Sequence, residues 1–308
     1  MTRSLQALAL GWMFCILAST ARAQTTQPAG PLGPGDYSRS LMMGDQQREY
    51  IIHVPKTYDA RKPTPIVLAI HGAAMNGAMM VPFCGMNKTS DENGFIVVYP
   101  SGTGVGPFLT WNAGAFPGGR NRPDDVAFIG KLLDELPTLV NVDTKRVYAC
   151  GMSNGAMMCY RLAAELSDRI AAIAPVAGTI AIAESHPKRA VPVLHFHGTK
   201  DPLVPFAGGR RTSQFKSVNE SIQTWMKLDG CDEKPVEDVL SKDGDDMKVT
   251  RKTWAGGKDG AEVELVIIEG GGHTWPGKQP PVGFLGKSAM NISADDLIWE
   301  FFKKHPMK

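Results

Sequence analysis

Residues 146–155 read Arg-Val-Tyr-Ala-Cys-Gly-Met-Ser-Asn-Gly, and this stretch decides the fold. The apolar run 146–150 predicts a buried strand, and the segment 155–166 predicts a helix. A G-x-S-x-G pattern joins the two, and its glycines allow the backbone to approach closely at a sharp turn. The pattern therefore predicts a strand–turn–helix unit that exposes the hydroxyl of Ser153. An ordinary Gly-Ser turn at a helix start is the alternative, because the pattern alone also arises by chance.

Strands and helices alternate along the rest of the chain. Apolar runs without polar alternation predict strands buried on both faces, and segments with helical periodicity separate them. This order predicts an α/β fold with a mostly parallel central sheet and helices on both faces, in a single domain. Two further strands at 37–41 and 49–54 flank a turn at 43–45. The predicted buried strands are 65–70, 95–99, 146–150, 170–176, 191–196 and 263–268, and the predicted helices are 124–139, 155–166, 217–228 and 294–304.

Partners for Ser153 are found by elimination among the histidines and acids that follow it. His273 is the candidate base, because it lies directly after the predicted core strand 263–268. His305 lies in a C-terminal tail that we expect to be frayed. Asp201 is the candidate acid, because it lies just past the end of a core strand, where such sheets present functional groups. The alternatives are a surface-loop histidine and a turn-forming aspartate before Pro202.

These residue types suit nucleophilic catalysis. A serine hydroxyl is a poor nucleophile unless a base accepts its proton, and the base needs a carboxylate to fix its tautomer. The developing oxyanion also needs hydrogen-bond donors, usually the N–H after the nucleophile and one from the loop after an early strand. By position, Asn154 supplies the first N–H, and Ala73 in the loop after strand 65–70 supplies the second.

The N-terminus predicts export. Arg3 precedes an apolar stretch at 5–17, which is too short to span a bilayer, and Ala21-Arg22-Ala23 matches a signal-peptidase site. We therefore expect residues 1–23 to be a signal peptide and the protein to be secreted, extracellular or periplasmic. A buried apolar helix is the alternative. The Pro-, Gly- and Thr-rich segment 24–35 predicts a disordered linker, so the catalytic domain is expected over 36–308.

Composition excludes several classes of partner. The 33 basic and 31 acidic residues give a net charge of +2 without any basic block, so we expect no nucleic-acid or membrane partner. The protein is also expected to be a monomer. No Cys/His cluster has zinc spacing, so no metal is expected. An oxidising compartment favours disulfides, and the four cysteines beyond the leader allow three complete pairings. We expect Cys84 to pair with Cys159, since both flank the site region; the other two are Cys150 and Cys231.

Six sequence blocks together resemble the secreted poly(3-hydroxybutyrate) depolymerase and feruloyl esterase family. The resemblance extends from about Tyr37 to the C-terminal helix. It implies an α/β-hydrolase fold, hydrolysis of carboxylic esters through an acyl-serine without a cofactor, and triad roles for Ser153, Asp201 and His273. The blocks are Gly72-Ala73-Ala74, Trp111-Asn112, Asp124-Asp125-Val126, Gly151-Met152-Ser153-Asn154-Gly155, His197-Gly198-Thr199-Lys200-Asp201 and Gly271-Gly272-His273-Thr274-Trp275-Pro276-Gly277.

The substrate is less closely defined. Hydroxycinnamoyl (feruloyl), acetyl or short hydroxyalkanoate esters are expected, carried by a small molecule or by a plant polysaccharide or polyester oligomer. Trp111 and Trp275 are candidates to stack on the acyl group or a sugar ring, and packing in the core is their alternative role. Two other functions remain open: a polyhydroxybutyrate or polyester depolymerase, and a non-catalytic polysaccharide-binding protein. We expect soluble esters to be cleaved better than crystalline polyester, since no polymer-binding module follows the catalytic domain.

Overall fold

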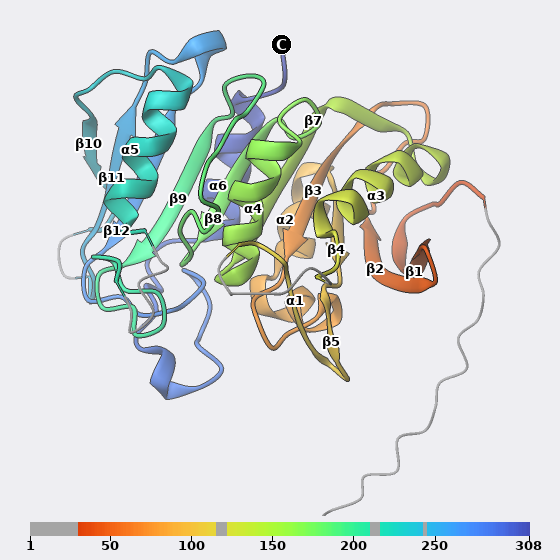
Figure 1. The fold of residues 1–308 in the computed structure, drawn as a ribbon, viewed down its shortest axis with the longest axis horizontal. Helices are drawn as coiled ribbons and strands as arrows, with labels where there is room; N and C mark the ends of the chain where they lie inside the picture. Colours follow the sequence, from red (N-terminus) through yellow and green to blue (C-terminus); the bar gives the residue numbers. More distant parts are fainter. Residues whose placement is uncertain (1–29, 115–121, 210–215, 243–244) are drawn as a thin grey trace, which may run out of the picture. The chain divides into compact units, whose positions relative to one another are not determined.

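A ten-stranded sheet forms the centre of the folded unit, which runs from Pro31 to Lys308 in this computed structural model (Figure 1). The structure describes residues 30–114, 122–209, 216–242 and 245–308. The strand order is β1-β2-β4-β3-β7-β8-β9-β12-β11-β10. The strands are β1 (Gly35–Met43), β2 (Gln46–Val54), β3 (Thr64–Ile70), β4 (Ile96–Pro100), β7 (Val142–Met152), β8 (Ala172–Val176), β9 (Val193–Gly198), β10 (Val236–Val239), β11 (Val249–Trp254) and β12 (Val263–Ile268).

The middle of the sheet, from β4 to β12, is parallel, and both of its edges are antiparallel. Strand β3 shows why its sequence is apolar throughout. Alternate residues such as Ile66 and Leu68 point to one face and Val67 and Ala69 to the other, and all are buried. The predicted α/β-hydrolase architecture, a mostly parallel sheet covered on both faces, is confirmed.

Helices form a layer on each face. The helices α3 (Asp125–Leu139), α4 (Asn154–Glu165) and α5 (Val218–Asp229) pack on one face, which is the front in Figure 1. The helices α1 (Gly77–Cys84), α2 (Met86–Asn93) and α6 (Ala294–Lys304) pack on the other. Side chains cap the N-termini of several helices. The carboxylate of Asp124 accepts a hydrogen bond from the N–H of Ala127 at the start of α3, and Ser217 and Glu220 form a capping box at the start of α5.

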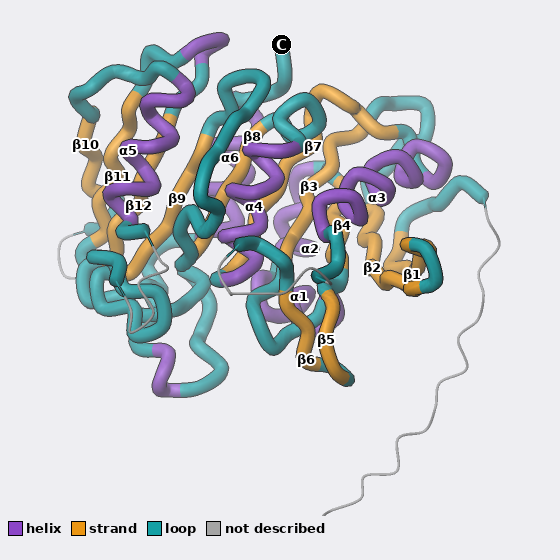
Figure 2. Tube along the Cα trace, viewed as in Figure 1, coloured by secondary structure: helices purple, strands orange, loops and turns teal. Residues whose placement is uncertain are grey.

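A short hairpin, β5 (Thr103–Val105) and β6 (Phe108–Thr110), lies outside the main sheet. A 3-10 turn, η2, lies at Gly283–Leu285. Both project from the lower edge of the sheet as drawn, among the loops coloured teal in Figure 2. A second 3-10 turn, η1, spans Lys258–Gly260.

The pairing predicted for Cys84 and Cys159 is wrong, because the four cysteines in the described ranges are all free thiols. Cys84 ends α1 on one face of the sheet, whereas Cys159 lies on α4 on the opposite face, so the sheet separates them. Burial raises the pKa of the Cys84 thiol to about 12, which keeps it protonated and unreactive at neutral pH.

The structure describes only part of the N-terminal segment to which the predictions apply. The predicted signal peptide, residues 1–23, lies outside the described residues, as does the start of the predicted linker. The end of that linker belongs to the folded unit, because Leu32 is buried and its N–H donates to the carbonyl of Leu139 (2.7 Å). Burial of the Leu32 side chain stabilises this end of the segment in the folded unit, although its composition is typical of a flexible linker.

Candidate active site

Ser153 occupies a strained turn between β7 and α4. Its φ of 58° and ψ of −118° lie in a region of backbone conformation that residues other than glycine rarely adopt. Such a conformation costs about 1–3 kcal/mol and persists only where the surroundings hold it. Here the N–H of Ser153 donates to the carbonyl of Val176 (2.8 Å), and its own carbonyl accepts from Met157 (3.0 Å). The turn is thus fixed from both sides while the serine stays partly exposed.

The glycines of the G-x-S-x-G pattern are required by packing. A Cβ on Gly155 would lie 2.3 Å from the carbonyl oxygen of Ile70 and 2.5 Å from that of His71. A Cβ on Gly151 would lie 2.7 Å from the backbone of Gly155. A side chain at either position would push α4 away from the end of β3. The strand–turn–helix unit predicted from the sequence is therefore what the structure contains.

Asp201 and His273 meet across two neighbouring parallel strands. Asp201 follows β9 and His273 follows β12, and the Nδ1 of His273 lies 2.8 Å from the Oδ2 of Asp201. Both side chains are almost fully buried. The loops are bound together, since the N–H of Lys200 donates to the carbonyl of Gly271 (2.9 Å). Gly198 permits this approach, because a Cβ there would lie 2.2 Å from the oxygen of Gly271.

The hydrogen bonds of Asp201 define the roles of the imidazole nitrogens. Its Oδ1 accepts the N–H groups of Leu203 and Val204, both at 2.8 Å, and its Oδ2 faces His273. An ionised carboxylate only accepts hydrogen bonds, so Nδ1 of a neutral His273 carries the proton. The Nε2 is then left with a free lone pair, as a general base requires.

The predicted site residues follow β7, β9 and β12, whose carboxyl ends share one edge of the sheet. The loop after β3 reaches the same place, because a Cβ on Gly72 would lie 3.5 Å from the Cβ of Ser153. His305 lies elsewhere. Its Nε2 is 3.2 Å from Glu262, which precedes β12 and so lies at the amino end of that strand, opposite the end that carries the site. His305 is also buried and hydrogen-bonded to Phe301, so the prediction that it is frayed is wrong.

The two predicted oxyanion donors lie beside Ser153. The backbone N–H of Asn154 opens α4, where helical N–H groups have no partner within the helix. In the loop after β3, the N–H of Ala74 donates to the carbonyl of Leu109 (2.8 Å). Within the described ranges, the N–H groups of Ala73 and Asn154 have no protein acceptor. Both N–H groups therefore keep a hydrogen that is free to donate.

Trp111 and Trp275 are buried in the core, with 0% and 1% of their surface exposed. A stacking role on substrate does not fit this burial, and core packing is the role the structure favours. Each indole instead holds a loop of the site. Trp111 donates to the carbonyl of His71 (3.0 Å), and Trp275 donates to the Oδ1 of Asp295 (2.9 Å). Burial raises the pKa of Asp295 to about 6, against the pull of nearby Lys278.

A buried ion pair accounts for two of the sequence blocks. Asp125 accepts from the guanidinium of Arg48 (2.7 Å) with one oxygen and from the N–H of Asn112 (2.7 Å) with the other. The adjacent N–H of Trp111 donates to the side-chain oxygen of Asn154 (2.7 Å). Asp125 thus fixes the 111–112 segment, and that segment fixes the start of α4 beside Ser153.

Two projections next to the site carry exposed apolar side chains, and no pattern in the sequence indicated them. On the β5–β6 hairpin, Val105 is 86% and Phe108 is 62% exposed; beside η2, Phe284 is 70% exposed. Both projections are bonded to the site. The hydroxyl of Thr110 donates to Asn154 (2.9 Å), and the N–H of His273 donates to the carbonyl next to Phe284, that of Leu285 (2.7 Å).

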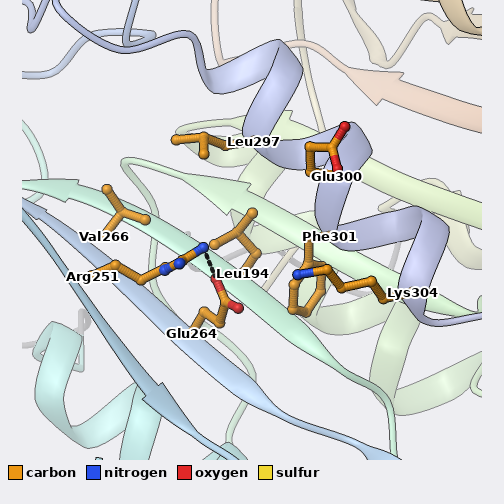
Figure 3. Close-up of a pocket in the computed structure, with 8 residues that line it drawn as sticks. All are labelled: Leu194, Arg251, Glu264, Val266, Leu297, Glu300, Phe301 and Lys304. Atoms are coloured by element: carbon orange, nitrogen blue, oxygen red, sulfur yellow. Dashed lines mark ion pairs between the residues drawn. The ribbon is translucent and has the colours of Figure 1, made fainter. Parts of the chain in front are cut away.

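Two cavities lie away from these residues. One of about 20 Å³, room for a single water, lies between β9, β11, β12 and α6. Figure 3 shows its charged lining, where Arg251 and Glu264 approach to 3.6 Å. A larger cavity of about 620 Å³ is lined by α3, the start of β7 and the C-terminal residues Met307 and Lys308. Neither includes Ser153, Asp201 or His273 in its lining.

Comparison with known proteins places the chain in a family. The profile of the Phospholipase/Carboxylesterase family matches residues 124–238, which include Ser153 and Asp201. NocK of Nocardia uniformis subsp. tsuyamanensis, which carries the name of an esterase, is 31% identical over 284 residues, covering 86% of this chain and 81% of that protein. The chain belongs to the esterases of the α/β-hydrolase family. This esterase is therefore a carboxylic ester hydrolase, as the sequence predicted.

Other relatives extend the likeness. Feruloyl esterase B of Piromyces equi is 28% identical to the esterase over 238 residues, 73% of this chain, which spans only 42% of that longer protein. The solved structure of an acetyl xylan esterase from Aspergillus awamori superposes with a TM-score of 0.58 at 18% identity, covering 87% of this chain and 99% of that one. That likeness shows the fold alone. In the described part of the esterase, no helix is both long and apolar enough to cross a membrane.

Proposed function

We propose that this esterase hydrolyses its substrates through an acyl-enzyme on Ser153, with His273 as general base and Asp201 as the group that orients it. The observation that carries the proposal is the 2.8 Å contact between His273 and Asp201 at the sheet edge where the strained Ser153 turn lies. A carboxylate buried against an imidazole, next to a serine held out on a turn, suits acyl transfer.

Each proton in the reaction has a carrier. The Oγ of Ser153 attacks the ester carbonyl carbon as the Nε2 of His273 takes the hydroxyl proton. The tetrahedral intermediate then breaks its bond to the alcohol oxygen, and His273 gives the proton to the leaving alcohol. A water molecule, deprotonated by His273, attacks the acyl carbon. The acid leaves, and the proton returns to Ser153.

The oxyanion is stabilised by the backbone N–H groups of Ala73 and Asn154. Neither N–H has a protein acceptor within the described ranges, and the side chain of Asn154 is already fixed by Trp111 and Thr110. Donors that are already in place need no reorganisation as charge develops. Each one is worth about 3 kcal/mol in the transition state.

Esters with an apolar or aromatic acyl group are the substrates that fit best. Two relatives are named for feruloyl and acetylxylan esters, and the two projections hydrogen-bonded to the site carry the exposed side chains of Phe108 and Phe284. These two residues replace Trp111 and Trp275 as the proposed contacts with a hydroxycinnamoyl ring. An aromatic contact of this kind contributes about 1 kcal/mol.

A polyester is the second candidate substrate. The exposed apolar tips at Val105, Phe108, Val282 and Phe284 would contact a hydrophobic polymer surface. Clearing of a polyhydroxybutyrate film would support this second candidate, and soluble esters serve as the comparison.

Export is part of the proposal. The charged start, the apolar stretch and the Ala21-Arg22-Ala23 site support cleavage after Ala23 and release as a secreted enzyme. The mass of the protein recovered from the medium or periplasm of an expressing cell tests this, and an intact Met1 end would contradict it.

The test of the function is a panel of p-nitrophenyl esters, methyl ferulate, acetylated xylan and polyhydroxybutyrate film. We expect pre-steady-state bursts of alcohol release with the activated esters, since an acyl-enzyme forms before it is hydrolysed. Ser153→Ala should remove both burst and turnover. The control Ser38→Ala should keep both. It removes an exposed hydroxyl on β1, the outermost strand of the sheet. Turnover that survives in Ser153→Ala would contradict the proposed nucleophile.

A further inference from the structure

Behind Asp201, three polar side chains form a line through the core. The hydroxyl of Tyr160 lies 2.8 Å from the Nδ1 of His195, and the Nε2 of His195 lies 3.0 Å from the Nδ1 of His197. The Nε2 of His197 lies 2.8 Å from the carbonyl oxygen of Val204. All three side chains are at most 1% exposed. The catalytic cycle proposed above does not use any of them.

The acceptor at the end of the line determines where each hydrogen lies. A carbonyl only accepts, so the Nε2 of His197 carries a hydrogen, and in a neutral ring its Nδ1 accepts. His195 must then donate from Nε2 and accept at Nδ1, where Tyr160 donates its O–H. Burial lowers the pKa of both histidines, which favours these neutral rings. Every polar atom in the line therefore has a partner of the right kind.

One end of the line encloses the carboxylate of Asp201. The Nε2 of His197 lies 3.5 Å from the Oδ2 that faces His273. The carbonyl of Val204 accepts from His197, while the N–H of the same residue donates to the Oδ1 of Asp201 (2.8 Å). His197 thus fixes Val204, the residue whose N–H holds one oxygen of Asp201, and places its own N–H near the other oxygen.

The other end of the line lies on the helix that begins at Ser153. Tyr160 is on α4, about two turns from the start of that helix. The line therefore connects the element that carries the proposed nucleophile to the loop that carries the proposed acid. Buried polar groups that are all satisfied stabilise one arrangement over its neighbours, because any shift leaves an unpaired group in the core.

We propose that His197 is a positioning residue for Asp201, and that His195 and Tyr160 fix its ring orientation and tautomer. This inference rests on the triad proposed above. It assigns a role to His197, the residue that opens the His197–Asp201 block, and to Tyr160, which the sequence analysis did not single out. The effect is indirect: the line keeps the Asp201 carboxylate aligned with His273, and none of its members contacts the reacting atoms.

Tyr160→Phe tests the inference with the least disturbance, because it removes one hydroxyl and keeps the ring. Its matched control is Tyr148→Phe, whose buried hydroxyl has no hydrogen-bond partner within the described residues. For Tyr160→Phe we expect kcat to fall about tenfold with KM within about twofold, since a small misplacement of a catalytic group lowers the rate of the chemical step. The acid limb of its pH–rate profile should also move to lower pH, because a displaced Asp201 stabilises the His273 cation less. Tyr148→Phe should change neither.

The tautomers give a second, independent measurement. In protein labelled with ¹⁵N-histidine, NMR of the wild type should show both His195 and His197 neutral with hydrogen on Nε2, and Tyr160→Phe should disturb this pattern at His195. A hydrogen on Nδ1 of His197, or a charged ring, in the wild type would overturn the inference. So would a Tyr160→Phe enzyme with unchanged kcat and an unchanged acid limb, given that Ser153→Ala is inactive. If Ser153→Ala stays active, the triad itself fails, which is a different result.

Discussion

Replacing Asp201 by Asn tests the proposed orienting role, and the structure determines how the amide must sit. Two backbone N–H groups, from Leu203 and Val204, point at Oδ1. The amide oxygen of the Asn has to occupy that position, so its NH₂ faces the Nδ1 of His273. Two donors cannot share a hydrogen bond, so Nδ1 must become an acceptor and Nε2 must carry the hydrogen. His273 then cannot accept the proton of Ser153.

The size of the loss follows from this inverted tautomer. A triad whose histidine holds the wrong tautomer loses about 10⁴-fold in kcat, equivalent to about 5.5 kcal/mol of transition-state stabilisation. The fold should survive, since the Asn keeps the two backbone hydrogen bonds. The assay is kcat for a p-nitrophenyl ester at neutral pH, with thermal unfolding as the control for folding. His273→Ala should be more damaging still. An Asp201→Asn enzyme within tenfold of the wild-type rate would refute the assigned role.

Three further predictions concern packing, buried charge and substrate. Gly155→Ala should destabilise the fold by about 3 kcal/mol in chemical denaturation, because its Cβ would lie 2.3 Å from the carbonyl oxygen of Ile70. The control Gly130→Ala on α3, whose Cβ would lie in open space, should stabilise the fold slightly, and equal effects of the two changes would contradict the packing argument. Burial raises the pKa of Asp229 from 3.8 to about 7, so the folded state binds that proton more tightly and stability falls as pH rises from about 4 to 7. Asp229→Asn has no charge to bury, so its advantage in unfolding free energy should grow across that range toward an upper bound of about 4 kcal/mol, and an equal difference at pH 4 and pH 8 would rule this out. Phe284→Ala should raise KM for methyl ferulate about fivefold and leave that for p-nitrophenyl acetate nearly unchanged. The control Val236→Ala, exposed on β10 at the end of the sheet opposite the site, should affect neither; a uniform change would show that the ring does not contact the acyl group.

Most of the fold could be predicted because its signals are local. The helix 294–304 is observed with the predicted bounds, and the buried strands match within a few residues, since apolar runs and helical periodicity report burial directly. The helices α1 and α2 could not be predicted in this way. The first contains Pro82 and the second is polar, and glycines in the left-handed conformation at 85 and 94 end them.

The site shows the same division. Ser153, Asp201 and His273 could be singled out because each follows a core strand, and parallel strands bring their carboxyl ends to one edge. The mistakes concern side chains whose surroundings come from distant segments. Whether Trp111 stacks on a ligand or under a loop depends on His71 and Phe128, and no periodicity reports that. The line from Tyr160 to His197 joins a helix face to a strand and exists only in three dimensions.

The measurement that tests the central claim most directly is covalent labelling with a fluorophosphonate, followed by peptide mapping. The account predicts one label per chain, carried on the Oγ of Ser153, with no labelling of Ser153→Ala and greatly slowed labelling of His273→Ala, because the activated hydroxyl needs its base. A label on another serine, or undiminished labelling of Ser153→Ala, would contradict it.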